Sequence, residues 1–170
     1  MYKFISLKTT QLSNSNINKI LKLKDFFWQF GKYSQLKWFK KNIKKNDIHN
    51  LLFYKKNLIG YTCLRRKKII NNKIKINCLL LDTFIIHPSH RKKKLSIILM
   101  KKNNFIIKKK KLISILLCSK KLENFYNKFN WQKIPTKKFN LIGVNLRKKL
   151  ILTYNNNLKF NFYQLLINHD

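Results

Sequence analysis

A basic stretch between an apolar segment and an apolar helix is the part of this sequence that most clearly predicts chemistry. Arg91–Lys94 follows the apolar segment Leu79–Ile86 and the turn signal His87-Pro88-Ser89, and a second apolar stretch begins at Leu95. This order predicts a strand, a loop that faces an anion, and a helix. Backbone N–H groups at the start of a helix bind phosphate because the positive end of the helix dipole lies behind them. We therefore expect an anion-binding loop here.

Cysteine and histidine residues are too scattered to predict a disulfide framework or a metal site. Cys63, Cys78 and Cys118 are isolated and odd in number, and His87 with His90 lacks a second pair of ligands. We interpret the cysteines as reduced core thiols, which fits the cytoplasm or another reducing intracellular compartment. No metal is expected by the ligand-spacing rules.

The charge of the chain indicates binding to polyanions such as nucleic acid, but its residue types weaken that interpretation. The net charge is +34, with 35 Lys against 4 Arg and 22 Asn against no Ala. Lys and Asn have A/T-rich codons, so an A/T-rich genome accounts for much of this charge. Arg is the residue that reads guanine edges, and its scarcity disfavours sequence-specific DNA recognition. Nonspecific binding of polyanions is still expected in dilute salt.

The length and hydropathy of the chain predict a single domain. At 170 residues the chain is long enough to bury a substantial core. Its longest apolar runs are broken by Lys or Asn before the ~18 residues that a membrane span needs. The first residues, MYKFISLKTT, lack the uninterrupted apolar region of a secretory signal. We expect a soluble protein, either a monomer or a homodimer, without a membrane partner.

Periodicity in the first half of the chain predicts a strand, two helices and a hairpin. The expected ranges are strand Tyr2–Leu7, helices Asn14–Phe30 and Lys32–Ile43, and hairpin strands His49–Tyr54 and Leu58–Leu64. Gly31 is expected to cap the end of the first helix, and Gly60 to mark a bulge or a close approach of two backbones. A polar turn is expected over Lys67–Lys73.

The second half predicts alternating strands and helices. The expected elements are strand Ile74–Ile86, helix Leu95–Lys109, strand Leu112–Leu117, helix Lys120–Phe129, and strands at Trp131–Ile134, Phe139–Val144 and Leu150–Tyr154. Asn155-Asn156-Asn157 predicts either a loop tip or the start of a mobile tail over residues 155–170. The resulting fold class is α/β, with a single mixed, mostly antiparallel central sheet flanked by helices.

Two segments of the chain resemble the general-control-related N-acetyltransferase (GNAT) superfamily, over roughly residues 49–134. In that family a strand ending in Val/Ile-x-Pro leads into an Arg/Gln-x-x-Gly-x-Gly/Ala loop that binds acetyl-CoA. Here Ile86-His87-Pro88 matches the strand end, and Arg91–Ser96 occupies the loop. Lys94 stands at the first Gly position and Ser96 at the Gly/Ala position. A Cβ at these positions obstructs the diphosphate or disfavours the required dihedral angles.

The resemblance implies a GNAT-like acyl-CoA N-acyltransferase fold with acetyl-CoA as co-substrate. Main-chain groups of the strand end would hold the pantetheine arm and polarise the thioester carbonyl. The cofactor-binding residues implied are Phe84, Ile85, Ile86, Arg91, Lys92, Lys93, Lys94, Leu95, Ser96 and Ser119.

The second matching segment is SKKLENFYNKFNW, which begins at Ser119 and ends at Trp131. It resembles the family pattern Asn-x-x-Ala-x-x-Phe/Leu-Tyr-x-Lys-x-Gly-Phe/Trp, with Asn130 in place of Gly. By this resemblance Tyr126 would protonate the departing CoA thiolate. An aromatic side chain packed between helix and sheet is the structural alternative for Tyr126.

Direct transfer to an amine also requires a proton acceptor, because a protonated amine has no lone pair. Asp82 is the only acid in its strand and shares a face with Phe84 and Ile86 by the two-residue strand period. It could act as the base, directly or through water, or hold the substrate ammonium. The family often has Glu two residues earlier, where this chain has Leu80. Cys118 lacks an evident histidine base, so a buried thiol is the simpler interpretation than a nucleophile.

These observations predict an N-acetyltransferase that transfers acetyl from acetyl-CoA to a small-molecule or protein amine. One alternative is a basic RNA- or ribosome-associated protein whose aromatic residues stack on bases. A third reading keeps the fold as a catalytically degenerate CoA-binding module, because a fold alone does not establish an activity.

Overall fold

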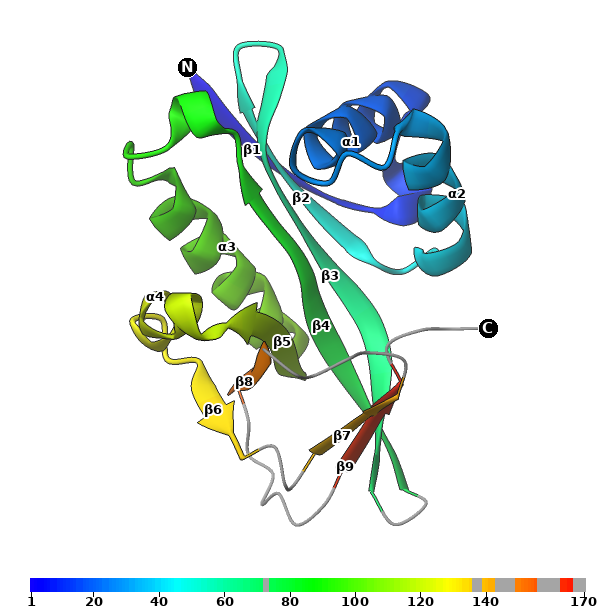
Figure 1. Ribbon diagram of the computed structural model, residues 1–170, viewed down its shortest axis with the longest axis vertical. Coiled ribbons are helices and arrows are strands. Elements are labelled where there is room, and N and C mark those ends of the chain that lie inside the picture. The colour runs from blue at the N-terminus through cyan, green and yellow to red at the C-terminus, as the bar shows by residue number, and fades with distance from the viewer. Residues whose placement is uncertain (72–73, 136–138, 143–148, 156–162, 167–170) are drawn as a thin grey trace. The chain divides into compact units, whose positions relative to one another are not determined.

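A computed structural model describes residues 1–71, 74–135, 139–142, 149–155 and 163–166 (Figure 1). The helices are η1 (Thr9–Gln11), α1 (Asn14–Phe27), α2 (Lys32–Asn42), η2 (Pro88–His90), α3 (Leu95–Lys110), η3 (Lys120–Leu122) and α4 (Glu123–Asn127). The strands are β1 (Tyr2–Lys8), β2 (Ile48–Tyr54), β3 (Asn57–Asn71), β4 (Ile74–Ile86), β5 (Ile113–Ser119), β6 (Gln132–Ile134), β7 (Phe139–Ile142), β8 (Lys149–Tyr154) and β9 (Tyr163–Leu166).

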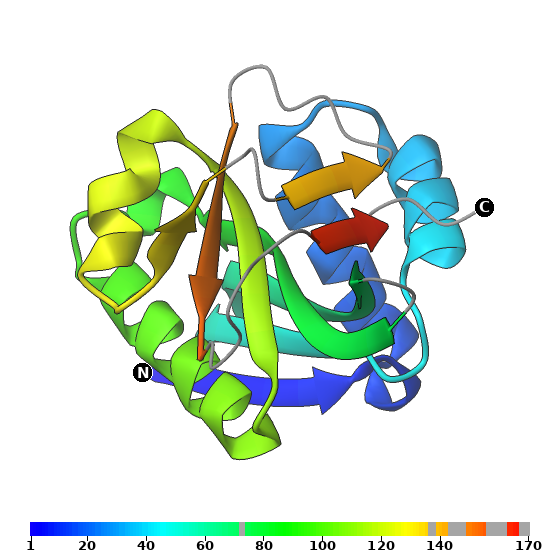
Figure 2. The same cartoon turned by 90° about the horizontal axis from the view of Figure 1, so that it is seen from below.

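The strands form one mixed sheet in the order β1-β2-β3-β4-β5-β8-β6, with β9 paired to both β3 and β7. β4 with β5 and β7 with β9 are parallel, whereas β1 with β2, β2 with β3 and β8 with its two neighbours are antiparallel. Figure 2 shows β8 between β5 and β6. The predicted fold class, a mixed and mostly antiparallel sheet flanked by helices, is confirmed.

The chain divides into two compact units, and β3, β4 and α3 each contribute to both. The first unit comprises residues 1–65 and 83–103, and the second comprises residues 66–82 and 104–170. We describe each unit by itself. No described helix has the length and apolar character needed to cross a membrane.

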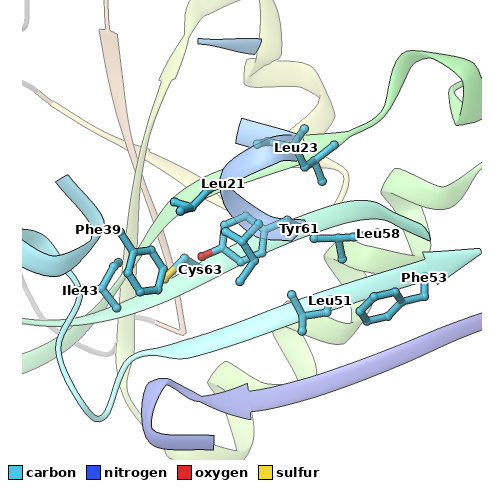
Figure 3. Close-up of a cluster of buried hydrophobic side chains, with 11 residues drawn as sticks. Leu21, Leu23, Phe39, Ile43, Leu51, Phe53, Leu58, Tyr61 and Cys63 are labelled. Carbon is cyan, nitrogen blue, oxygen red and sulfur yellow. The ribbon is translucent and has the colours of Figure 1, made fainter. Parts of the chain in front are cut away.

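In the first unit, α1 and α2 cover one face of the sheet and lie side by side (Figure 1). Their apolar side chains pack on β2 and β3, and Figure 3 shows Leu21 of α1 near Tyr61 of β3 and Phe39 of α2 near Cys63 of β3. Ser13 begins α1 because its hydroxyl accepts the Asn16 N–H at 3.2 Å. Burying each such Leu or Phe contributes about 2 kcal/mol.

The opposite face of the first unit holds the start of α3. Ile85 packs with the α1 and α2 residues, whereas the next residue, Ile86, packs with Leu95 and Leu99 of α3. Successive side chains of a strand point to opposite faces, so the end of β4 is fixed from both sides. This anchoring positions the loop that joins β4 to α3.

Gly60 lies at an irregularity between β2 and β3. The register of β2 with β3 shifts between Leu52 and Phe53, directly opposite Gly60. A Cβ at Gly60 would lie 2.8 Å from Ile86 Cδ1 and 3.1 Å from Leu52 Cβ. The predicted bulge is therefore confirmed, and the close neighbours of Gly60 are side-chain atoms of Ile86 and Leu52, not a second backbone.

Two local predictions in the first half of the chain are wrong. Gly31 does not cap α1, which ends at Phe27 with Trp28 as its cap; Gly31 precedes α2 with φ 78° and its N–H donates to Asp25 Oδ1. The polar turn expected at Lys67–Lys73 is strand up to Asn71, where β3 ends, and residues 72 and 73 lie outside the described residues. The polar side chains on this part of β3 led to the wrong prediction of a turn, although Ile69 is fully buried.

The second unit differs from expectation near its helix and its C-terminal part. The expected helix at Lys120–Phe129 is divided into the 3₁₀ turn η3 and the short α4. A strand, β9, lies within the segment where a loop tip or mobile tail was expected, and it pairs with β3 and β7. The predicted strand Phe139–Val144 is described only to Ile142 as β7; residues 143 and 144 lie outside the described residues.

Candidate functional site

A pocket of about 260 Å³ lies at the start of α3, within the first unit. Its lining residues are Ile86, His90, Arg91, Lys92, Lys94, Leu95 and Ser96. All of these except His90 were predicted to bind the cofactor. His90 was missed because the family pattern assigns no role at its position, although its place in a turn before a basic loop could have drawn attention to it.

The loop backbone adopts a conformation that normally calls for glycine. Lys92 has φ 63° and Lys94 has φ 56°, both in the left-handed region. The steric conflict of Cβ in this region costs a residue other than glycine roughly 1–2 kcal/mol. Lys94 stands where the family pattern has Gly, and its backbone is left-handed, as a Gly would favour. The lysine therefore bears the conformational cost.

The first turn of α3 presents backbone donors beside this loop. The N–H groups of Ile97 and Ile98 donate to the Lys94 carbonyl at 3.1 and 3.3 Å, which closes the first helical turn. The N–H groups of Leu95 and Ser96 precede that turn, where an α-helix has no intrahelical acceptors for them. Leu95 is buried under the pocket, so this turn is held in place. The arrangement suits a phosphate group.

Arg91 and Lys93 differ in their surroundings from the two lysines that line the pocket, Lys92 and Lys94. The Arg91 guanidinium lies 5.4 Å from the ring centroid of Phe27, and its Nε is 3.4 Å from the Ile86 carbonyl oxygen. Arg91 lines the pocket, and its guanidinium also lies near Phe27 of α1. Lys93 is exposed and is not among the described lining residues.

The end of β4 supplies main-chain groups next to the loop. The parallel register of β4 with β5 covers Cys78–Leu81, and β4 continues to Ile86. Phe84 is half-buried on the α3 face, and Ile85 is buried on the other face. The side chains of Phe84 and Ile85 thus serve packing, and the expected role of their main chain in binding the co-substrate stays a prediction.

Tyr126 lies buried in the second unit, in α4. Burial, and secondarily the neighbouring Cys118, raises the pKa of its phenol well above the ordinary value. The phenol is therefore protonated at neutral pH, as a proton donor must be. The aromatic packing offered as the alternative is also present, since the Tyr126 and Trp131 rings lie 6.4 Å apart at a steep angle.

Two hydrogen bonds join the turn after α4 to α3 within the second unit. The indole Nε1 of Trp131 donates to Asn104 Oδ1 at 3.0 Å, and the Asn104 amide donates to the Phe129 carbonyl at 2.9 Å. Asn130, which replaces the family's Gly, has φ 63°. Asn tolerates this left-handed conformation better than most residues because its short side chain can hydrogen-bond locally.

Cys118, Ser119 and Asp82 also belong to the second unit. Burial, followed by the charge of Glu123, raises the pKa of the Cys118 thiol to about 11. Cys118 is thus a neutral thiol at pH 7, which disfavours it as a nucleophile. Ser119 is exposed at the end of β5, and Asp82 is exposed on β4.

The structure brings the loop residues together around one pocket, whereas Tyr126, Asp82 and Ser119 lie in the other unit. Within the described residues, no three His, Cys, Asp or Glu side chains are grouped as metal ligands would be. Acidic groups are also absent from the described lining of the loop pocket.

No family model and no curated protein matches this sequence. Solved structures do match. ElaA of Escherichia coli has a TM-score of 0.65 and 17% identity, covering 90% of this chain and 99% of its own. An acyl-CoA N-acyltransferase from Pseudomonas aeruginosa has a TM-score of 0.68 and 12% identity over 90% and 99% of the two chains.

A third match carries a ligand. Naa50 of Arabidopsis thaliana, in complex with the bisubstrate analogue CoA-Ac-MVNAL, has a TM-score of 0.60 and 14% identity over 89% and 97% of the two chains. At such low identities the likeness concerns the arrangement of the chain. From its sheet order, its loop at the start of α3 and these neighbours, this chain has the fold of the GNAT N-acetyltransferases.

Proposed function

We propose that this protein is an N-acetyltransferase that transfers the acetyl group of acetyl-CoA directly to a primary amine. The observation that carries the proposal is the pocket at the start of α3, where Lys92 and Lys94 keep the left-handed backbone despite the strain. Strained backbone of this kind is common at ligand-binding loops, and here it occurs beside a helix start whose N–H groups suit a phosphate.

The diphosphate of acetyl-CoA would occupy the pocket at the start of α3. The first-turn N–H groups of Leu95 and Ser96 would donate to its oxygens, and the Lys92 and Lys94 ammonium groups would add charge-assisted hydrogen bonds. The main chain of Phe84–Ile86 would pair with the pantetheine arm, and Ser119 would contact the same co-substrate. Arg91 and Lys93 would contribute to the positive field that attracts it.

The acetyl group would be transferred by addition of the amine to the thioester carbonyl, followed by elimination of the CoA thiolate. A neutral amine attacks the thioester carbonyl carbon, and the carbonyl electrons move onto oxygen, where a main-chain N–H stabilises the charge. As the carbonyl forms again, the C–S bond breaks and its electrons stay on sulfur. Tyr126 would donate its proton to this thiolate, and Asp82 would accept a proton from the amine nitrogen or hold the ammonium before attack.

The acceptor is an amine on a small molecule or on a protein. The Naa50 analogue joins CoA to the peptide MVNAL, so the same fold accommodates a peptide amine in that protein. The present chain has only 5 acidic residues, so an acceptor with one amine and an otherwise neutral surface fits it better than a polycation.

Calorimetric titration with acetyl-CoA at physiological salt tests the cofactor site, with ATP as the control for indiscriminate anion binding. We expect saturable binding of acetyl-CoA and no comparable binding of ATP. Lys94→Glu should weaken acetyl-CoA binding by about tenfold or more, because it places a negative charge beside the diphosphate. Lys101→Glu, an exposed α3 residue outside the pocket lining, is the matched control.

Equal, salt-sensitive binding of ATP and acetyl-CoA would contradict the proposal and favour a general polyanion-binding protein. Once acetyl-CoA binding is established, a screen of peptide and small-molecule amines would test transfer. Binding of acetyl-CoA without transfer to any amine class would indicate a degenerate CoA-binding module instead of an enzyme.

A further inference from the structure

The turn between α1 and α2 (Figure 1) exposes four large aromatic side chains. They form what we call the aromatic patch: Phe26, Trp28, Phe30 and Tyr33, which are 54%, 42%, 69% and 79% exposed. All four fall within eight consecutive positions of the chain. Exposing such rings to water forfeits the free energy of their burial. A cluster of them on a surface therefore indicates an interaction site.

The rings of the aromatic patch follow one another closely along the turn. The ring centroid of Phe27 lies 5.4 Å from that of Phe26 and 6.3 Å from that of Trp28. Phe30 follows in a tight bend, because its N–H donates to the Trp28 carbonyl at 2.7 Å. Tyr33 belongs to the first turn of α2. The aromatic patch is therefore formed by one short stretch of chain within the first unit.

Hydrogen bonds fix the backbone that presents these rings. Asp25 Oδ1 accepts the Gly31 N–H at 2.8 Å, and Gly31 has φ 78°. The side-chain amide of Gln35, which is buried, donates to the Trp28 carbonyl at 2.7 Å. The backbone N–H of Gln35 donates to the Gly31 carbonyl at 3.0 Å. The rings are thus presented by an ordered turn, which lowers the entropy cost of inserting them into a partner.

The charges of the first unit favour an anionic partner for this surface. Lys22, Lys32 and Lys37 are exposed before, within and after the stretch that forms the aromatic patch. The first unit, whose residues are all described, contains two acidic residues, Asp25 and Asp47. Asp47 is buried, and Asp25 is half-buried and accepts the hydrogen bond described above. No exposed carboxylate of this unit therefore offsets the lysines.

We propose that the aromatic patch binds the surface of a membrane that contains anionic lipids, with its rings in the headgroup region. Trp and Tyr favour this depth because each combines an apolar ring with a polar group, and Phe inserts at the boundary with the acyl chains. The neighbouring lysines add attraction to anionic headgroups. Such a peripheral contact needs no spanning segment, and the lack of one was the basis for expecting no membrane partner. The inference goes beyond the proposed acetyl transfer and does not depend on it.

A single-stranded nucleic acid is the main alternative occupant, because bases also stack on aromatic rings. Proteins that bind such strands place these rings along a positively charged groove. Trp28, Phe30 and Tyr33 are exposed and do not belong to the lining of any described pocket. Exposed rings at a turn between two helices suit the interface of a bilayer better than a groove for bases.

The first test measures whether Trp28 enters a bilayer. The full chain is mixed at physiological salt with vesicles of phosphatidylcholine and phosphatidylserine whose acyl chains carry bromine, which quenches tryptophan fluorescence at short range. Trp28 is exposed, whereas Trp38 is half-buried and Trp131 is buried. We expect quenching in the native protein and its loss in Trp28→Phe, which keeps an aromatic ring and should still bind the vesicles. Vesicle binding of the native protein without quenching would overturn the proposal, because it would show adsorption by charge alone.

Phe30→Ala tests the contribution of apolar insertion. We expect its partitioning into the anionic vesicles to weaken about tenfold, as the loss of one inserted phenylalanine should. Phe105→Ala is the matched control, because Phe105 is 65% exposed and lies on α3, outside the aromatic patch. Its partitioning should change less than about twofold, because its ring would stay in water. Equal losses in the two variants would overturn the proposal, and so would equally strong partitioning into vesicles of phosphatidylcholine alone.

Two further measurements would identify a different occupant of the aromatic patch. If Phe30→Ala weakened binding of single-stranded poly(uridine) and left vesicle partitioning unchanged, the aromatic patch would be a nucleic-acid site. If sedimentation velocity showed a dimer that Phe30→Ala dissociates, with vesicle partitioning again unchanged, it would be an interface between two copies of this chain. Either result would overturn the assignment to lipid. None of these measurements needs acetyl-CoA, so their failure is distinguishable from a failure of the proposed acetyl transfer.

Discussion

The residues with left-handed backbone show how this sequence maintains turns with few glycines. In the described chain the residues with positive φ other than Gly31 are Lys55, Lys92, Lys94, Lys111, Asn130 and Asn155. The whole sequence has 3 Gly against 35 Lys and 22 Asn. An A/T-rich gene would supply Lys and Asn codons where glycine codons are lost. The backbone of these turns is retained, and each lysine there bears a conformational cost.

Replacing Lys94 by glycine should stabilise the protein. Lys94→Gly removes the steric conflict at φ 56°, and we expect the free energy of unfolding to rise by about 1 kcal/mol after the added chain entropy of glycine is subtracted. Lys93→Gly is the control, because Lys93 is not among the residues with positive φ and should lose stability. Urea denaturation of the two variants measures the difference. Equal changes in the free energy of unfolding of Lys94→Gly and Lys93→Gly would contradict the inference that Lys94 is strained.

Replacing Tyr126 by phenylalanine should impair turnover while leaving cofactor binding intact. Removal of the proton donor should lower kcat by about 10²–10³-fold, and the dissociation constant for acetyl-CoA should change less than about twofold. Tyr154→Phe is the control, because Tyr154 is also buried and stacks on the same Trp131, at 5.4 Å. Comparable kcat losses in both variants would assign Tyr126 a packing role.

At the scale of elements, the end of β4 is determined by its contacts on both faces. Ile85 packs against α1 and α2, Ile86 packs against α3, and the missing side chain of Gly60 leaves space for Ile86. The sequence pattern found β4 and the start of α3 because an apolar run, a proline turn and a second apolar run are strong local signals. It did not find the continuation of β3 or the strand β9, whose pairing depends on distant parts of the chain.

Gly60→Ala should destabilise the first unit by about 1–3 kcal/mol, because its Cβ would meet Ile86 Cδ1 at 2.8 Å. Ile86→Val deletes that δ-methyl group. The double variant should therefore be more stable than the sum of the two single changes predicts, and thermal unfolding of all four proteins measures this coupling. Purely additive effects would show that the contact between Gly60 and Ile86 is not the constraint.

His49 links η1, β2 and β3 through two short contacts. Its Nε2 lies 2.9 Å from Thr9 Oγ1 and its Nδ1 lies 2.8 Å from Tyr61 Oη. Burial, and secondarily the charge of Lys24, lowers the pKa of His49 from 6.5 to about 4. The ring is therefore neutral in the folded protein at pH 7, and both ring nitrogens can take part in hydrogen bonds.

This lowered pKa predicts a loss of stability in acid. Between pH 6.5 and pH 4 the unfolded chain binds a proton at His49 that the folded chain does not, so stability is full above pH 6.5 and falls as the pH decreases toward 4. The loss approaches roughly 3 kcal/mol. Urea denaturation across this range should show the slope in the native protein and a weaker slope in His49→Asn. An unchanged slope in that variant would exclude His49 as the cause.

At the scale of the whole molecule, charge of one sign dominates. The chain carries 39 basic against 5 acidic residues. Such an excess repels itself in the compact state and attracts polyanions of every kind. A specific anion site in such a protein would therefore have to be recognised by geometry, as at a helix start, since charge alone does not distinguish one anion from another.

Salt should stabilise the folded protein. Raising NaCl from 0.1 M to 1 M shortens the screening length from about 10 Å to about 3 Å, which reduces repulsion among the lysines. We expect the melting temperature to rise by roughly 5 °C, corresponding to about 2 kcal/mol for a chain of this size. Differential scanning calorimetry measures it. A constant or falling melting temperature would show that ion-specific or local contacts outweigh the net repulsion.

The sequence by itself predicted the fold class, most of the elements and the position of the loop between β4 and α3, because hydrophobic period and turn residues act over a few neighbouring positions. Only the tertiary structure placed His90 in the loop pocket, put Lys92 and Lys94 in the left-handed region, and left the aromatic patch exposed between α1 and α2. These features depend on packing between segments far apart in the chain, and local residue patterns do not contain that information.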